Sequence, residues 1–160
     1  MAETTGLWHR ANSFIRHTTL RQKFAAPILY VVLGLARAMV LSMPFRSYAP
    51  LLGELAQDNA ACASPSASEA NRAMRIGYLI EGVAQFTPWN SNCLAQAIVA
   101  SLCLRLLKIG YSVHFGVAKS GDGAASLEAH SWVMAGEYPV TGFEEAQGMT
   151  CLRTFRLEPL

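Results

Sequence analysis

Residues 89–110, WNSNCLAQAIVASLCLRLLKIG, constrain the fold most, because they predict a long helix that begins at a cysteine. Apolar residues recur there at near-helical spacing, and Gly110 is typical of the position just past a helix end. Ser91 or Asn92 can cap the first turn, so Cys93 is expected at the first or second helical position. Unpaired N–H groups and the helix dipole favour a thiolate at that place, and the thiolate is the reactive form of cysteine.

Two strands are expected next, and their lengths return one histidine to the cysteine. The run YSVHFGVA at 111–118 alternates apolar and polar residues, as a half-buried strand does. A helix of about sixteen residues rises roughly 22–24 Å, which a strand covers in about seven residues. A second strand at 129–135, AHSWVMA, then lies antiparallel to the first, so His130 comes level with Cys93, whereas His114 lies half way along. Such a Cys/His pair is the minimum for acyl transfer through a thiolate.

The chain around Cys93 also offers groups for binding a substrate carbonyl. The backbone N–H of Cys93 could form an oxyanion site with one side-chain donor; the candidate donors are Asn90, Asn92 and Gln85. An ordinary N-cap is the competing interpretation of Asn92. Trp89 and Trp132 are expected to form walls of the cleft, with ordinary core positions as the alternative.

The residues CLAQAIVASLCLRLLKIGYSVHFGVAKSG, then AHSW, then GEYPVTG, resemble the transglutaminase-like cysteine peptidases that remove leader peptides in lasso-peptide biosynthesis, the B proteins. The likeness covers about residues 87–142, and the apolar stretch 29–53 is similar to the N-terminal region of the same family. The resemblance implies that Cys93 is the nucleophile and that His130 is the general base and acid.

The sequence departs from the family pattern at the third catalytic position, where the family has a carboxylate on the strand after the histidine. Hairpin pairing puts Gly142 or Phe143 opposite His130, and neither side chain can orient an imidazole. Glu144 is the nearest carboxylate beyond that point and is the candidate for the third member. A backbone carbonyl near Thr141 is the alternative acceptor.

The expected fold class is α+β, with N-terminal helices followed by a papain-like or transglutaminase-like core. In that core, the cysteine-bearing helix packs on a roughly four-stranded antiparallel sheet. The expected division is an N-terminal helical region at 1–58, basic and then apolar, a linker or loop at 59–69, and the cysteine protease core at 70–160. The most apolar segment, 24–43, is expected to be a helix packed on protein and not a bilayer span, because Arg37 lies within it.

Composition narrows the classes of partner. The chain is 52% hydrophobic and 15% charged, which leaves apolar surface for a partner or a membrane. A net charge of +2 gives no reason to expect nucleic acid, but residues 1–50 carry six Lys or Arg against one acid. The four cysteines show no zinc-ligand spacing, so neither a metal nor another cofactor is expected, and such sparse usage is typical of a reduced cytoplasmic protein.

By resemblance, the protein would cut the leader from a lasso precursor peptide, so that an ATP-dependent, asparagine-synthetase-like cyclase can close the ring on the freed amine. The N-terminal residues do not read as the small leader-binding module of longer members, which implies a separate leader-binding protein as partner. The expected location is the cytoplasm, with peripheral contact to the inner face of the membrane through the basic N-terminal helices. Two other functions stay open: an amide-forming acyltransferase on the same Cys/His pair, and a non-catalytic subunit that binds the precursor or the cyclase.

Overall fold

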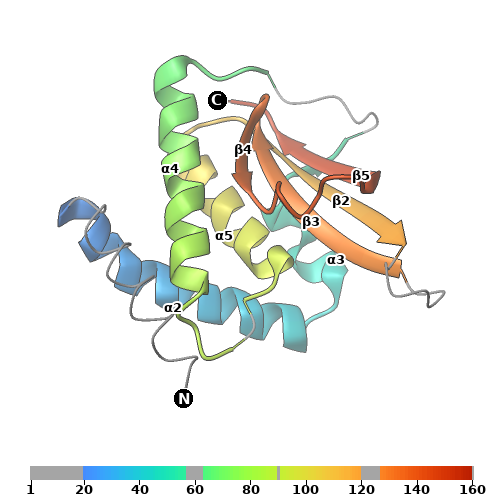
Figure 1. Cartoon of the computed structure of the whole chain (residues 1–160), viewed down its shortest axis with the longest axis horizontal. Coiled ribbons are helices and arrows are strands. Elements are labelled where there is room, and N and C mark those ends of the chain that lie inside the picture. The colour runs from blue at the N-terminus through green and yellow to red at the C-terminus, as the bar shows by residue number, and fades with distance from the viewer. Residues whose placement is uncertain (1–19, 57–62, 90, 120–126, 160) are drawn as a thin grey trace.

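The computed structural model describes residues 20–56, 63–89, 91–119 and 127–159. The described part forms helices packed on one antiparallel sheet with the strand order β1-β5-β2-β3-β4 (Figure 1). The predicted α+β class is confirmed. The strands are β1 (Glu54–Leu55), β2 (Tyr111–Lys119), β3 (Leu127–Ala135), β4 (Tyr138–Thr141) and β5 (Thr150–Leu157).

The cysteine-bearing helix, α5, lies in the middle of the molecule. It packs on β3 on one side and on α2 and α4 on the others, and its inner face belongs to one continuous hydrophobic core (Figure 1). The helical elements are α2 (Leu20–Ser42), α3 (Phe45–Tyr48), the 3-10 turn η1 (Ala49–Leu51), α4 (Ala67–Ala84) and α5 (Cys93–Leu106).

The sheet has five strands in the described residues, one more than the sequence predicted. The extra strand, β1, has two residues, which is too short to show an alternating pattern. The last strand, β5, does not extend the β3–β4 hairpin. It crosses to the other side and pairs with β2, leaving β4 at the edge beside α4.

Local sequence signals explain where α5 begins and ends. The side chain of Asn92 accepts the N–H of Ala95 at 3.2 Å, which makes Asn92 the N-cap and Cys93 the first helical residue, as predicted. The predicted end at Gly110 is wrong by several residues. The helix stops at Leu106, because Lys108 adopts a left-handed conformation (φ +57°) and turns the chain toward β2.

The start of α4 corrects the predicted linker at 59–69. The helix begins at Ala67, because Ser66 and Glu69 form a capping box: the Ser66 hydroxyl accepts the N–H of Glu69, and the Glu69 carboxylate accepts the N–H of Ser66 at 2.9 Å. The Ser-x-x-Glu spacing was visible in the sequence. Residues 57–62 of the predicted linker lie outside the described part of the chain.

Helix α2 is buried along one stripe only. Leu29, Leu33 and Ala36 enter the core shared with α5, so the N-terminal region and the cysteine-bearing region are packed together. The opposite stripe is exposed and apolar, and includes Phe24, Ile28, Val31 and Leu35. By length and composition alone, Phe24–Ser42 could cross a membrane; its mean hydropathy is 2.0 and 17% of this window is buried.

Candidate active site

Cys93 and His130 line the same open pocket, whose volume is about 920 Å³. The walls come from α4, the loop before α5, the first turn of α5, the start of β3, and β4 with the residues that follow it. The start of α5 and the start of β3 therefore lie at the same pocket, as predicted. Asn90, one of the candidate donors, lies outside the described residues.

The loop that leads into Cys93 is held by short polar contacts. The hydroxyl of Thr87 lies 2.8 Å from that of Ser91 and 2.9 Å from the carbonyl oxygen of Trp89. The side-chain amide of Gln96, one turn into α5, donates to the carbonyl of Ser91 at 2.8 Å. These bonds hold the chain at the entry to the helix, where Cys93 is partly exposed and lines the pocket.

Helix α2 supports the same loop through Trp89. The indole packs on Tyr30, with ring centroids 5.0 Å apart, and a Cβ at Gly34 would lie 3.0 Å from the ring. Trp89 lines the pocket, as expected of a cleft wall, and its Nε1 is buried without a hydrogen-bond partner. Because Nε1 is shielded from solvent, the indole contributes to the wall through its packing on α2 and not as a donor to a substrate.

The imidazole of His130 is oriented by the backbone of Gly142. Its Nε2 lies 2.8 Å from the Gly142 carbonyl oxygen. A carbonyl only accepts, so Nε2 carries the hydrogen, and the neutral ring keeps the lone pair on Nδ1. That tautomer is the one able to take a proton from a thiol on the other side of the ring.

Gly142 is suited to this contact because it has no side chain. Its φ is +68°, in the left-handed region, and an added Cβ would lie 2.8 Å from the Ser131 carbonyl oxygen and 2.9 Å from His130 Nε2. Hairpin pairing had placed Gly142 beside His130, and the backbone acceptor kept as an alternative is the one that the structure shows. Glu144, the candidate third member, lies in the pocket wall, whereas the contact to Nε2 comes from Gly142.

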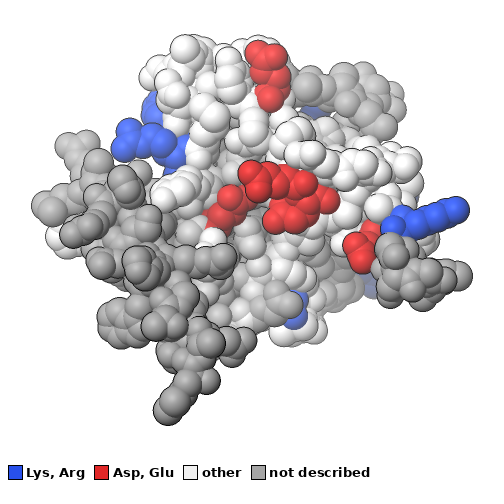
Figure 2. Space-filling model, in the orientation of Figure 1, with Lys and Arg blue, Asp and Glu red and all other residues white. Residues whose placement is uncertain are grey.

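Glu81 on α4 is a pocket residue that is not among those predicted from the sequence. Its Oε1 accepts the N–H of Gly142 at 2.9 Å, and the residue lines the pocket while keeping part of its surface exposed. Enclosure of the carboxyl raises the pKa of Glu81; the Gly142 hydrogen bond opposes this, and Glu145 and Glu144 raise the pKa further. Figure 2 shows acidic side chains gathered in the middle of this face. No sequence signal joins residues 61 positions apart.

The other predicted residues fall in different places. Gln85 lines the pocket at the end of α4, whereas the side chain of Asn92 serves as the helix cap. Trp132 is not among the residues that line the pocket. It stacks on His114 with centroids 5.4 Å apart and packs over Gly116.

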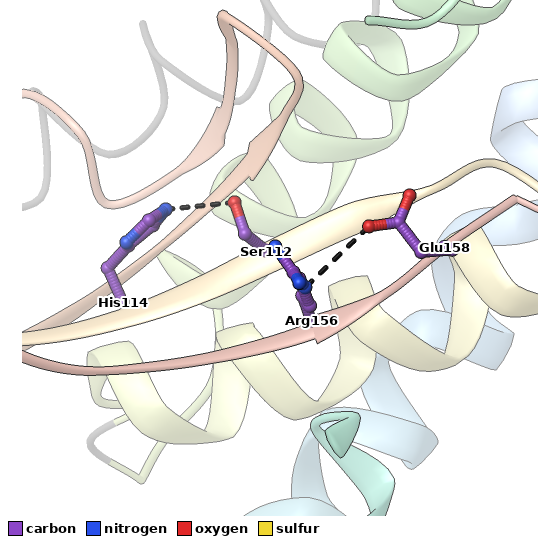
Figure 3. A network of polar contacts seen from close by, with 4 residues as sticks. All are labelled: Ser112, His114, Arg156 and Glu158. Atoms are coloured by element: carbon purple, nitrogen blue, oxygen red, sulfur yellow. Dashed lines mark hydrogen bonds and ion pairs between the residues drawn. The ribbon is translucent and has the colours of Figure 1, made fainter. Parts of the chain in front are cut away.

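His114 belongs to a separate polar cluster on the sheet. Its Nε2 lies 2.8 Å from the Ser112 hydroxyl, as Figure 3 shows, and its Nδ1 lies 3.1 Å from that of Thr154. Burial lowers the pKa of His114. The sulfur of Cys151 is 3.9 Å from Nδ1, but the described residues contain no group of three His, Cys, Asp or Glu that could hold a metal.

A cysteine at a helix start and a histidine in the same pocket are the pair of side chains that acyl transfer through a thiolate requires. The comparison with protein families identifies the family: the model described as the transglutaminase-like superfamily matches residues 39–154. The chain belongs to the transglutaminase-like superfamily, whose fold is of the cysteine protease or acyltransferase type. The match begins within α2 and crosses the domain border predicted at 58. No curated protein and no solved structure matches the chain.

Proposed function

We propose that this protein is a cysteine peptidase that removes the leader from a lasso-peptide precursor. One observation carries the catalytic part: Cys93, at the first position of α5, shares a pocket with His130, whose Nε2–H is held by the Gly142 carbonyl. The resemblance of residues 87–142 to lasso leader peptidases supports the choice of substrate.

The chemistry follows from the tautomer of His130. Nδ1 takes the proton of the Cys93 thiol, and the thiolate adds to the scissile carbonyl. The oxyanion that forms can accept from the Cys93 N–H and from the side-chain amide of Gln85, which lines the pocket. When the C–N bond breaks, the imidazolium gives its proton to the departing amine, and the leader remains on the sulfur as a thioester. Water, deprotonated by the same imidazole, hydrolyses the thioester and restores the thiol.

The proposal includes partners that the resemblance implies. A separate leader-binding protein would deliver the precursor, and an asparagine-synthetase-like cyclase would use the freed amine. The exposed apolar stripe of α2 offers a surface for a protein or a membrane next to the pocket loop that α2 supports. We place the protein in the cytoplasm, with peripheral contact to the inner face of the membrane.

The two alternatives differ in their support. An amide-forming acyltransferase would use the same thioester and differ only in resolving it with an amine. A non-catalytic subunit would be consistent with the missing acid at position 142 or 143, but the Gly142 carbonyl gives His130 another acceptor, which supports an enzyme.

The test is cleavage of the precursor by purified protein with the leader-binding partner, followed by mass spectrometry. The expected products are free leader acid and core peptide, and Cys93→Ala should form neither while keeping its melting temperature. Products joined to an added amine in preference to water would identify the acyltransferase instead. Undiminished cleavage by Cys93→Ala would remove this cysteine as nucleophile.

A further inference from the structure

We propose that Glu81 is a positioning residue that holds the Gly142 carbonyl against His130, so that a helix carboxylate and a backbone carbonyl together replace the side chain of a third catalytic residue. The inference rests on the proposed thiolate mechanism. It concerns the geometry of His130 in the absence of substrate, so it can be tested independently of cleavage.

Gly142 makes two hydrogen bonds to side chains just past the last residue of β4 that pairs with β3. The last paired position of β4 is Thr141, opposite Val133 on β3. Gly142 follows directly, and its N–H is donated to Glu81 Oε1 at 2.9 Å while its carbonyl accepts from His130 Nε2 at 2.8 Å. The position of the carbonyl therefore depends on where Glu81 holds the N–H.

The packing of α4 on β4 explains how Glu81 reaches this point. One turn earlier, Gly77 lies so close to β4 that an added Cβ would overlap the carbonyl of Val140. Glu81 follows Gly77 by one turn of α4, and Gly142 follows Val140 by two residues. The close contact at Gly77 therefore brings this part of α4 next to the end of β4, where Glu81 meets the Gly142 N–H.

The arrangement divides the task of a triad carboxylate between two groups. Such a carboxylate fixes the tautomer of the imidazole and favours the imidazolium that forms during reaction. Here the Gly142 carbonyl fixes the Nε2–H tautomer, and Glu81 fixes the carbonyl. Glu81 touches neither the substrate nor the reacting atoms in this account, and acts only through Gly142.

The experiment compares three variants with the wild-type protein. Glu81→Ala removes the acceptor, whereas Glu81→Gln keeps an oxygen that can accept the Gly142 N–H. Glu69→Ala is the matched control, because it removes a glutamate hydrogen-bonded at the far end of the same helix, in the capping box. It should lower helix stability by about 1 kcal/mol without reaching the pocket.

Two readouts separate positioning from stability. The first is the tautomer of His130 in the free protein, read from imidazole ¹⁵N shifts and assigned with His130→Gln. We expect the Nε2–H form in wild type, Glu81→Gln and Glu69→Ala, and a mixture of forms in Glu81→Ala. The second is cleavage, where Glu81→Ala should lower kcat by about 10- to 100-fold with little change in KM, since misplacement by about 1 Å can cost up to 10²-fold.

Two results would overturn the inference. Glu81→Ala could match Glu69→Ala in both tautomer and kcat, which would make Glu81 a structural tie between α4 and β4. Alternatively, Glu81→Gln could be as impaired as Glu81→Ala, which would exclude the hydrogen bond as the cause. If the wild-type protein cut no precursor, the proposed function would fail while the tautomer measurement still decided the role of Glu81.

Discussion

Gly142→Ala should lower catalytic activity because the added methyl group would collide with His130, and Gly148→Ala is the control for the effect of backbone strain. Gly142 and Gly148 both have φ in the left-handed region, at +68° and +83°. An alanine at either position therefore pays a backbone strain of about 1–2 kcal/mol. An added Cβ at Gly148 meets nothing within 4 Å, whereas at Gly142 it would come within 2.9 Å of His130 Nε2 and 2.8 Å of the Ser131 carbonyl oxygen.

The difference between the two variants measures the steric contact alone. Ordinary contact begins near 3.4 Å, so Gly142→Ala must move the imidazole or the peptide by several tenths of an ångström. That overpacking should add about 1–3 kcal/mol to the loss of stability. Displacing His130 from Gly142 should also lower kcat by on the order of 10²-fold.

The assay is urea unfolding together with leader cleavage for both variants. Gly148→Ala should lose only the roughly 1–2 kcal/mol of stability that backbone strain costs, and it should keep kcat close to the wild-type value. Gly142→Ala should lose more stability and most of its turnover. Equal kcat values for the two variants would refute the claim that the Gly142 contact orients His130.

Three further predictions follow from the described contacts. Burial lowers the pKa of His114 below its ordinary 6.5, so the fold is most stable with His114 neutral and loses stability as the pH falls below 6.5. His114→Gln should therefore flatten the dependence of melting temperature on pH between 7 and 5. An unchanged slope would contradict this. Gln85→Ala should lower kcat by on the order of 10²-fold with a smaller change in KM if its amide donates to the oxyanion, whereas unaltered turnover would exclude that donor. Alkaline carbonate should release the protein from membranes, since Arg37 lies within the apolar part of α2, and retention in the pellet would indicate a span.

The parts of the site that could be predicted are those governed by local rules. The Asn92 cap and the start of α5 at Cys93 follow from a few neighbouring residues. The return of His130 to that level follows from the rise of a helix and of a strand, because one connection follows the other along the chain. Hairpin pairing also brought Gly142 near His130.

The parts that escaped prediction depend on backbone atoms or on distant segments. The acceptor for His130 is a main-chain carbonyl. Every residue has such a carbonyl, so the residue type cannot predict which one is used. Glu81 reaches Gly142 only because α4 packs on β4. Strand β5 pairs with β2 and not with β4, the strand that precedes it in the sequence. Neither arrangement leaves a periodic pattern. The capping box at Ser66 and Glu69, by contrast, has a local signal in the sequence, the Ser-x-x-Glu spacing.

The central claim, that Cys93 is a nucleophile activated by His130, is tested most directly by alkylation with limiting iodoacetamide at neutral pH and peptide mapping of the modified cysteines. Burial raises the pKa of the Cys103 thiol, so that cysteine should react slowly. The account predicts that Cys93 is modified first, and that His130→Gln slows its modification by at least about 10-fold without changing the rate at Cys151. Equal modification of Cys93 and Cys151 in the wild-type protein, or no effect of His130→Gln, would contradict the account.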